Sequence, residues 1–428
     1  MKAAFYTLGC KVNQYETQLM AEALEQAGYE IVDCAQNADV YIVNSCTVTA
    51  ASNQKTRQSL RAFKRKHPES IMVLAGCMSQ AYPKEAEALS EADIIIGNTE
   101  HKHLAQLIED FKTHNKRQIA LASHTRDESF ECGTITAFAG KTRAEMKIED
   151  GCNRYCSYCA IPYARGFVRS KPLESIRSEA TALAAAGFRE IVLVGINLSA
   201  YNFNGADIAD AVQTVAAVEG IARVRLGSLE PDHITEDIIT RLACEDKFCA
   251  QFHISLQSGC DKTLKAMNRH YTATDYAALC KSLRARFSDC SITTDIMVGF
   301  PGESEEDFEA SYRFAKEIGF EKMHVFPYSV RAGTKAATMP EQISKAVKNQ
   351  RAKKMLALAE TLRREHFEKE IGNCHEVLFE TEKGGYFYGH TKNYIPIKVK
   401  TSRKLSGEIY PVSISDYDDE YCIGIIQK

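Results

Sequence analysis

The chain has 428 residues, 45% hydrophobic and 25% charged, which excludes a disordered or fibrous protein and predicts a folded globular one. The formal net charge of −3 excludes a global positive field, so nucleic-acid binding would have to use local basic patches. No apolar run is long enough for a membrane span, and the first ten residues turn polar too soon for a secretory signal. We therefore expect a cytoplasmic protein with no membrane partner.

The chain contains fifteen cysteines, an odd number and too few for a disulfide scaffold. A chain of this length can build a hydrophobic core without covalent cross-links. Reduced thiols that serve as metal ligands are therefore the expected use of these cysteines.

Residues 1–120 alternate short β-rich runs with helical stretches, which is typical of a mostly parallel sheet covered by helices. The expected strands are 2–8, 40–44, 71–75 and 94–96, and the expected helices are 13–27, 51–66 and 101–111. Residues 121–142 are polar and irregular, and we interpret them as a linker.

Residues 143–330, the main part of a central domain expected over 143–371, alternate again, and their six strand–helix units predict an open or partial (β/α)6 barrel, because a complete eight-unit barrel needs about 250 residues, more than this span contains. The expected strands are 144–148, 190–194, 222–226, 251–255, 292–298 and 322–326, with helices such as 173–186 and 305–318 between them. A long helix over 341–371 closes this segment.

Residues 372–428 change character, because short β runs separated by Gly, Asn and Asp replace the alternation of strand and helix. The expected strands are 377–379, 386–391, 395–399 and 412–414. This pattern predicts a small all-β barrel or sandwich. The whole chain is thus of the α/β class with an all-β C-terminal domain.

The strongest local signal is the loop 151–159, in which Cys152, Cys156 and Cys159 follow the spacing C-x-x-x-C-x-x-C. Three thiolates on one loop can hold three irons of a 4Fe-4S cluster and leave the fourth iron open for chemistry. Structural zinc is the main rival, but it usually takes four ligands. Incidental cysteines are the remaining alternative.

A second, scattered triplet consists of Cys10, Cys46 and Cys77, each just after an expected strand. The carboxyl ends of parallel strands share one edge of the sheet, so these thiols should converge into a second metal site. Three unrelated buried thiols are the competing interpretation, since free cysteines are often buried.

The loop Cys152–Cys159 with the following Ala-Ile-Pro-Tyr-Ala-Arg-Gly of 160–166 resembles the radical S-adenosylmethionine methylthiotransferases, and the likeness covers essentially the whole chain. Residues 8–17, Leu-Gly-Cys-Lys-Val-Asn-Gln-Tyr-Glu-Thr, resemble the branch that acts on threonylcarbamoyladenosine in tRNA. The branch acting on isopentenyladenosine tends to show Gly-Cys-Gln-Met-Asn here, and the branch acting on a ribosomal protein Gly-Cys-Pro-Lys-Asn. The last segment is similar to a TRAM domain, an RNA-binding β-barrel.

This resemblance implies two 4Fe-4S clusters and S-adenosylmethionine as cofactors. Cys152, Cys156 and Cys159 would hold the cluster that binds S-adenosylmethionine, and Cys10, Cys46 and Cys77 an auxiliary cluster that carries the sulfur to be donated. The implied reaction adds a methylthio group to the adenine carbon between the two ring nitrogens of threonylcarbamoyladenosine, 3′ of the anticodon.

Further cofactor-binding candidates follow the barrel strands, where functional side chains of such folds lie. Tyr158 could pack against the adenine of the cofactor or simply fill the core. Glu230 could accept hydrogen bonds from ribose hydroxyls or be a helix-start charge. His253 is as readily a structural histidine as a lining residue. The other candidates are Gly195, Asn197, Ser228, Ser255, Gln257 and the turn of Gly299, Pro301 and Gly302, whose glycines would let backbone approach the cofactor.

The expected partners are the anticodon arm of tRNA and a reductant protein of flavodoxin or ferredoxin type, with no DNA. Basic and aromatic side chains on strands suit phosphate contact and base stacking, so the RNA-binding candidates are Arg165, Lys392, Tyr394, Lys398 and Lys400. Residues 366–428 carry 8 Lys and Arg against 10 Asp and Glu, so binding there would use one face.

Two alternative hypotheses for the function remain open. The same chemistry could act on isopentenyladenosine in tRNA or on a ribosomal protein. Alternatively, the chain could be a non-catalytic iron–sulfur protein that binds RNA, although an iron left without a cysteine ligand in each triplet argues for catalysis.

Overall fold

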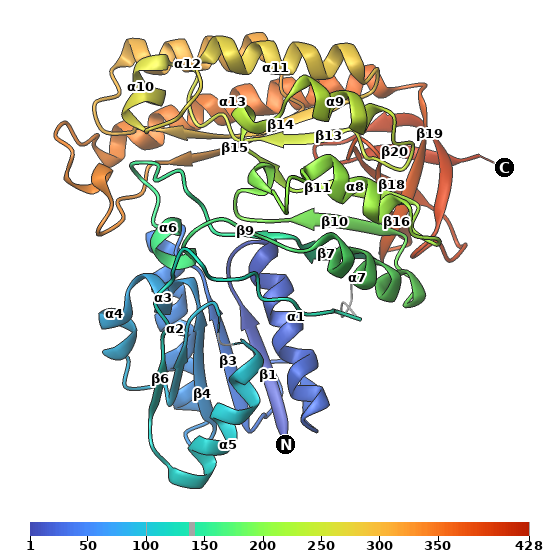
Figure 1. Ribbon diagram of the computed structural model, residues 1–428. Helices are drawn as coiled ribbons and strands as arrows, with labels where there is room; N and C mark the ends of the chain where they lie inside the picture. The colour runs from blue at the N-terminus through green and yellow to red at the C-terminus, as the bar shows by residue number, and fades with distance from the viewer. Residues whose placement is uncertain (100, 137–141, 428) are drawn as a thin grey trace.

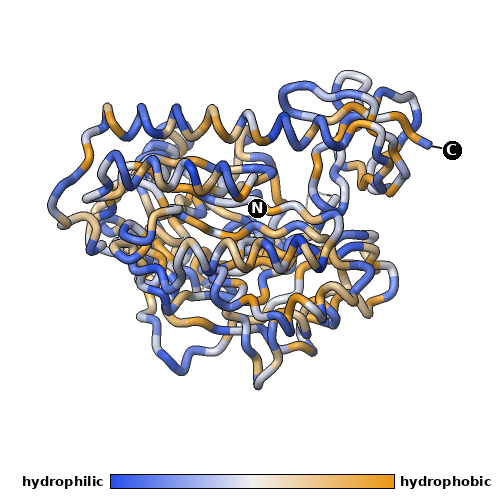
Figure 2. Tube along the Cα trace, turned by 90° about the horizontal axis from the view of Figure 1, so that it is seen from above, coloured by the Kyte–Doolittle hydropathy of each residue, from blue (hydrophilic) through white to orange (hydrophobic). Residues whose placement is uncertain are grey.

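A computed structural model describes residues 1–99, 101–136 and 142–427, and Figure 1 shows three units in contact. A parallel sheet with helices on both faces forms the N-terminal unit, an open barrel of strands and helices lies above it, and a small β-barrel stands at one side. Seen from above, that C-terminal barrel projects at one corner of the molecule (Figure 2). No helix among the described residues is both long enough and apolar enough to cross a bilayer.

The N-terminal unit is built on a six-stranded parallel sheet of order β2-β1-β3-β4-β5-β6. Every residue of β3 and β4 is buried, because helices cover both faces of the sheet. The strands are β1 (Lys2–Thr7), β2 (Glu30–Val32), β3 (Val40–Ser45), β4 (Ile71–Gly76), β5 (Ile94–Ile96) and β6 (Gln118–Ala120). The helices are α1 (Lys11–Gln26), α2 (Ala50–Lys66), α3 (Cys77–Ala81), α4 (Pro83–Glu87), η1 (His101–His103) and α5 (Leu104–His114).

Residues 122–136 contain no helix or strand and lie against both larger units, and residues 137–141 of the expected linker fall outside the described residues. The backbone N–H of Thr136 donates to Glu22 on α1 (2.9 Å), and that of Ile135 donates to Glu179 of the barrel (3.3 Å). This irregular segment is therefore packed against its neighbours rather than extended into solvent.

The central unit confirms the expected partial barrel, with six parallel strand positions in the order of the chain. The third position is divided: β11 pairs with β10, and after Gly227 the chain continues as β12, which pairs with β13. The strands are β7 (Arg143–Lys147), β10 (Glu190–Val194), β11 (Arg223–Leu226), β12 (Ser228–Leu229), β13 (Gln251–Ile254), β14 (Ser291–Val298) and β15 (Lys322–Pro327). A short antiparallel pair, β8 (Glu149–Asp150) and β9 (Arg169–Ser170), flanks the cysteine loop.

Helices cover the outside of this barrel, and several begin with a side-chain cap. Ser304, Thr272 and Asp207 each close a capping box at the start of their helix. The helices are α6 (Ile161–Arg165), α7 (Leu173–Ala185), η2 (Leu198–Ala200), α8 (Ile208–Ala216), η3 (Pro231–His233), α9 (Glu236–Ala243), α10 (Asp261–Ala266), α11 (Ala273–Arg286), α12 (Glu305–Ile318), η4 (Lys335–Thr338) and α13 (Lys345–Glu370).

The C-terminal unit is a closed five-stranded barrel of order β16-β17-β18-β20-β19. Its strands are β16 (Cys374–Lys383), β17 (Tyr386–Thr391), β18 (Pro396–Lys400), β19 (Ile409–Tyr417) and β20 (Cys422–Ile426). The sequence pattern predicted four of these strands: β17 with its observed bounds, β18 shifted by one residue, and β16 and β19 too short. It missed β20, together with β2 and β6. β2 and β6 have only three residues each, too few to show a strand periodicity.

Candidate iron–sulfur and substrate site

The scattered cysteines meet at the carboxyl edge of the N-terminal sheet, where β1, β3 and β4 lie side by side. Cys10 precedes α1, Cys46 follows β3, and Cys77 begins α3. Burial raises the pKa of the Cys77 thiol to about 12, Arg165 opposes that rise, and the neighbouring Cys46 and Cys10 add to it. The three cysteines thus stand at the carboxyl ends of neighbouring parallel strands, at one edge of the sheet.

A buried network of amides holds this edge in shape. Asn13 Nδ2 donates to the Ser45 carbonyl (2.9 Å), and Asn44 Nδ2 donates to the Asn13 carbonyl (3.0 Å). Gly76 has a φ of +92°, and a Cβ there would lie 2.3 Å from Asn44 Oδ1. Only glycine fits at this position, which directly precedes Cys77.

Arg165 stands at the junction of the N-terminal unit and the barrel. Its guanidinium donates to Glu16 on α1 (2.6 and 2.9 Å) and to Asp150 beside the cysteine loop (3.1 Å), and its side chain is 0% exposed. Lys147 donates to the same two carboxylates. The prediction that Arg165 binds RNA is wrong, because a fully buried, ion-paired cation has no surface to offer a phosphate.

The second trio lies on one loop between β8 and α6. Gly151 turns the chain with a φ of +88°, Cys152 N–H donates to the Gly166 carbonyl (3.0 Å), and Cys159 N–H donates to the Cys156 carbonyl (3.0 Å). Burial raises the pKa of Cys152 and of Cys159 to about 12 each; Cys159 and Cys156 add to the rise at Cys152, and Cys156 adds to the rise at Cys159. Mutual repulsion of this kind is relieved when a cationic metal centre takes the thiolates.

Arg269 connects this loop to the barrel interior, and sequence reasoning did not single it out. Its guanidinium donates to Cys156 Sγ (3.3 Å) and to the Ser255 carbonyl (3.2 Å), and it pairs with Glu230. Arg269 lies between α10 and α11 and belongs to no sequence motif, so only the folded structure reveals its contact with the cysteine loop. The contact places a permanent positive charge beside the second trio.

The chemistry of the two donor sets, three cysteine thiols each, fits iron–sulfur clusters. In the described parts of the chain, no three His, Cys, Asp or Glu side chains are arranged to hold one metal ion. A 4Fe-4S cluster takes each thiolate on a different iron, so its ligands stand farther apart than those of zinc. Each trio supplies three thiolates, the donor set for a 4Fe-4S cluster with one iron left open.

A cavity of about 470 Å³ opens inside the barrel, directly beside Cys10. Its wall consists of alternate residues of the strands, Arg225 on β11, His253 on β13, Asp295 on β14 and His324 on β15, because every second side chain of a strand faces inward. His253 is hydrogen-bonded to Thr293 (2.9 Å) and also lines the cavity, so both expectations for it hold. A cavity of this size accommodates a nucleoside.

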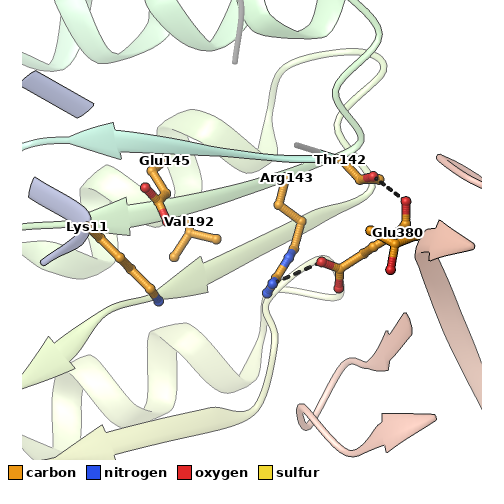
Figure 3. A pocket seen from close by; sticks show the side chains of 7 residues that line it. Lys11, Thr142, Arg143, Glu145, Val192 and Glu380 are labelled. Carbon is orange, nitrogen blue, oxygen red and sulfur yellow. Dashed lines mark hydrogen bonds and ion pairs between the residues drawn. The ribbon is translucent and has the colours of Figure 1, made fainter. Parts of the chain in front are cut away.

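A smaller cavity of about 170 Å³ adjoins the first, and Lys11 lines both. Figure 3 shows Lys11 entering it from α1, with Glu145 and Arg143 on β7 and Glu380 on the C-terminal barrel. Arg143 donates to Glu380 (3.2 Å) and to Tyr394 Oη (3.2 Å). Val12, next in the chain, is buried against Val192 and Val194 of β10 and so fixes the start of α1 on the barrel.

Four of the predicted cofactor residues lie at the strand ends near the cysteine loop. Gly195 and Ser228 line the larger cavity. A Cβ on Gly195 would lie 2.6 Å from Glu149 Oε2, and Asn197 N–H donates to that same oxygen (2.7 Å). The Glu230 carboxylate forms an ion pair with Arg269 and makes no hydrogen bond to the start of the following helix.

The remaining cofactor candidates are engaged in local structure. Ser255 offers its carbonyl to Arg269 and Tyr271, and Gln257 adopts a φ of +66°. Tyr158 packs edge-on against Phe300 at 6.4 Å, which matches the core-filling alternative.

The turn after β14 faces the long helix α13. A Cβ on Gly299 would lie 2.4 Å from Lys348 Cγ, so side-chain atoms of α13 occupy the space where the sequence suggested close approach of a cofactor. Pro301 is buried, and Gly302 N–H donates to the Glu341 carbonyl (3.1 Å).

The RNA-binding candidates of the C-terminal barrel separate into two groups. Tyr394 lines the larger cavity with the guanidinium carbons of Arg225 and Arg143 4.7 and 5.1 Å from its ring centroid. Lys400 is exposed on β18. Lys398 pairs with Asp418, and Lys392 donates to the Asp246 carbonyl of the central unit (2.9 Å). Tyr394 thus belongs to the cavity, whereas Lys400 stands on the surface.

Two family models match the chain. Uncharacterized protein family UPF0004 matches residues 2–97, and the Radical SAM superfamily matches residues 146–315. The first covers the unit that carries Cys10, Cys46 and Cys77, and the second the barrel with the C-x-x-x-C-x-x-C loop.

Curated proteins align with nearly the whole chain. The threonylcarbamoyladenosine tRNA methylthiotransferase MtaB of Bacillus subtilis is 37% identical over 96% of this chain and 93% of its own length. The protein of that name from Aquifex aeolicus is 36% identical over 93% and 96%. A tRNA-2-methylthio-N(6)-dimethylallyladenosine synthase of Pelotomaculum thermopropionicum is 30% identical over 99% and 97%.

Solved structures share the fold at low identity. The radical S-adenosylmethionine methyltransferase TsrM of Kitasatospora setae, with cobalamin and a [4Fe-4S] cluster bound, aligns with a TM-score of 0.57 and 15% identity, over 78% of this chain and 74% of its own. Identity and coverage of the curated relatives, together with both family models, show that this chain belongs to the radical S-adenosylmethionine methylthiotransferase family.

Proposed function

We propose that this methylthiotransferase modifies threonylcarbamoyladenosine 3′ of the anticodon of tRNA, at the adenine carbon between the two ring nitrogens. The observation that carries the proposal is the cavity that runs from Cys10 into the barrel and is large enough for a nucleoside. Five curated relatives named for threonylcarbamoyladenosine are 31–37% identical to this chain, and three named for dimethylallyladenosine are 30–33% identical, so the highest identities, 34–37%, belong to the first group.

The proposed ligands are Cys152, Cys156 and Cys159 for the cluster that binds S-adenosylmethionine and Cys10, Cys46 and Cys77 for an auxiliary cluster. When bound, these groups and S-adenosylmethionine supply the electron transfer, the carbon–sulfur cleavage and the sulfur, with electrons from a donor of flavodoxin or ferredoxin type. The chain supplies orientation and excludes water.

Three groups of this chain have assignable roles. Arg269 fixes Cys156 and Glu230 relative to each other. Glu230 is proposed to accept ribose hydroxyls of S-adenosylmethionine, since an ionised carboxylate retains further acceptor sites beyond those used by Arg269. Tyr394 presents a ring in the cavity and is proposed to contact the target base.

The substrate assignment predicts selective modification of one RNA. Protein reconstituted with iron and sulfide under reducing conditions should add a methylthio group to an anticodon stem-loop carrying threonylcarbamoyladenosine, detected by mass spectrometry of the released nucleosides. The same stem-loop with isopentenyladenosine should react at least tenfold more slowly. Preferential modification of the isopentenyl RNA, or of a ribosomal protein, would assign the enzyme to another branch.

The exposed face of the C-terminal barrel predicts a separate effect on RNA affinity. Lys400→Gln should weaken binding of whole tRNA severalfold and lower the slope of log affinity against log salt by about 1, because one phosphate contact is lost. Deleting 372–428 is a poorer test than the point variant, because Arg223 and Arg225 of β11 donate to carbonyls of the barrel segment 376–392. A salt slope that does not change in Lys400→Gln would remove Lys400 from the interface.

A further inference from the structure

The smaller cavity, which shares Lys11 with the larger cavity that Cys10 lines, has a chemical character that the general reaction does not require. Lys11, Arg143, Glu145, Thr142 and Glu380 line it, with Val192 as an apolar member. Transfer of the methylthio group requires only that the reactive carbon of the adenine faces the sulfur. The smaller cavity, which is polar and charged, is not needed for that contact. Its chemistry suits a polar substituent of the target base.

The cationic side chains around the cavities differ in whether they already have hydrogen-bond or ion-pair partners. Arg225 donates to Glu190 (2.8 Å) and to the Lys392 carbonyl (2.8 Å), and Arg143 is held by Glu380 and Tyr394. Lys11 Nζ has neither a hydrogen bond nor an ion pair with any residue in 1–99, 101–136 or 142–427. Glu145 on the wall of the smaller cavity attracts Lys11 without a hydrogen bond or ion pair between them, so the ammonium group is still available for an anionic ligand.

The position of Lys11 follows from its neighbours in the chain. Cys10 belongs to the first trio, and Val12 packs on Val192 and Val194, so the backbone of Lys11 is fixed on both sides. Its side chain therefore has a defined starting point, and Figure 3 shows it extending into the smaller cavity. Such a lysine has a fixed backbone position, while its flexible side chain lets the ammonium group adjust to a ligand.

The substrate of the proposed function carries the complementary group. The threonylcarbamoyl substituent ends in a carboxylate and is attached to the amino nitrogen of adenine, on the same edge of the base as the carbon between the ring nitrogens. A base whose reactive carbon faces the Cys10 trio thus presents this substituent to the walls next to Cys10. The isopentenyl substituent at the same nitrogen is a hydrocarbon and offers no partner to a cation.

We propose that Lys11 binds the carboxylate of the threonylcarbamoyl group and thereby selects threonylcarbamoyladenosine over adenosines with apolar substituents. This inference rests on the proposed function, because it assigns the residue that recognises that substrate. Lys11 is a specificity-determining residue here; it moves no proton and transfers no group in the reaction. The remaining polar lining, Thr142, Arg143 and Glu145, surrounds the urea and hydroxyl groups of the same substituent.

The test compares two RNAs that differ only at the carboxylate. One anticodon stem-loop carries threonylcarbamoyladenosine, and the other carries its methyl ester, which keeps the shape and removes the charge. The reconstituted wild-type protein should bind the free acid more tightly by about tenfold or more, the effect of a charge-assisted hydrogen bond. Lys11→Gln should bind both RNAs with the affinity that the wild-type protein shows for the ester.

Two matched variants locate the effect. Lys322→Gln makes the same charge change at β15 in the larger cavity and should keep the preference for the free acid. Lys400→Gln should weaken both RNAs equally, since a phosphate contact does not depend on the base. Loss of the preference in Lys322→Gln but not in Lys11→Gln would overturn the assignment, as would equal binding of acid and ester by the wild-type protein.

The outcomes separate this inference from the proposed function. If the wild-type protein methylthiolates the threonylcarbamoyl RNA but binds acid and ester equally, the role of Lys11 is refuted and the function stands. If the wild-type protein methylthiolates neither the threonylcarbamoyl RNA nor its methyl ester, the proposed substrate itself is refuted. Iron content of Lys11→Gln equal to that of the wild-type protein shows that the neighbouring Cys10 site is intact.

Discussion

Replacing Cys10 by alanine is expected to abolish transfer of the methylthio group while reductive cleavage of S-adenosylmethionine continues. The reason is the separation of the two trios: Cys10, Cys46 and Cys77 stand at the edge of the N-terminal sheet, whereas Cys152, Cys156 and Cys159 share one loop of the barrel. The measurements are methionine release under reducing conditions and mass spectrometry of the RNA nucleosides.

The reciprocal variant should behave differently. Cys156→Ala removes a thiol of the barrel loop, to which Arg269 donates, and should abolish both cleavage of S-adenosylmethionine and modification of RNA. Iron analysis should show the loss of one cluster in either variant. Cys244→Ala is the matched control, because Cys244 is an exposed thiol at the end of α9, outside both trios. Methylthiolated product formed by Cys10→Ala would refute the sulfur-carrying role of the first trio.

The substitution Glu16→Gln is expected to loosen the contact between the N-terminal unit and the barrel. Glu16 and Asp150 are buried carboxylates that share the cations of Lys147 and Arg165, and these cations lower the pKa of Glu16 to about 2. Removing the charge of Glu16 leaves two cations with one carboxylate between them. Breaking a buried ion pair in this way costs about 3–5 kcal/mol.

Hydrogen exchange measures this cost locally, which suits a protein of several units because global unfolding is not two-state there. Backbone amides of α1 and α6 should exchange more than about a hundredfold faster in Glu16→Gln. Glu109→Gln is the control, since Glu109 pairs with Lys112 at an exposed site of the same unit, where such pairs contribute about 0–1 kcal/mol. Equal protection of α1 in both variants would show that the buried network does not hold the units together.

The network also explains why adjacent residues of the segment 8–17 serve different purposes. Cys10 belongs to the first trio, Lys11 faces the cavities, Val12 packs on β10, and Glu16 meets Arg165. Tyr15 Oη donates to Glu179 on α7 (3.1 Å). The first turns of α1 thus contact the first trio, the cavity and the barrel at the same time. This is possible because side chains three or four residues apart share one face of a helix, whereas adjacent side chains point in different directions.

Several features follow from the amino-acid sequence alone. Spacing on one loop identifies Cys152, Cys156 and Cys159 as a group, since a short loop confines its side chains whatever the fold. The strand-end rule brings Cys10, Cys46 and Cys77 together, because parallel order places the carboxyl ends of neighbouring strands at one edge. Periodicity also predicts the six strands of the barrel, which are confirmed with bounds that differ by at most one residue.

Only the tertiary structure decides which charges are buried and which are free. Arg165, predicted to meet RNA, pairs with carboxylates from α1 and β8, and Arg269 reaches Cys156 across more than a hundred residues of sequence. Tyr394, predicted on an RNA-facing surface, turns into the cavity between Arg143 and Arg225. A sequence records residue types and local periodicity, whereas the partner of a charged side chain depends on which distant segments packing brings within a few ångströms of it.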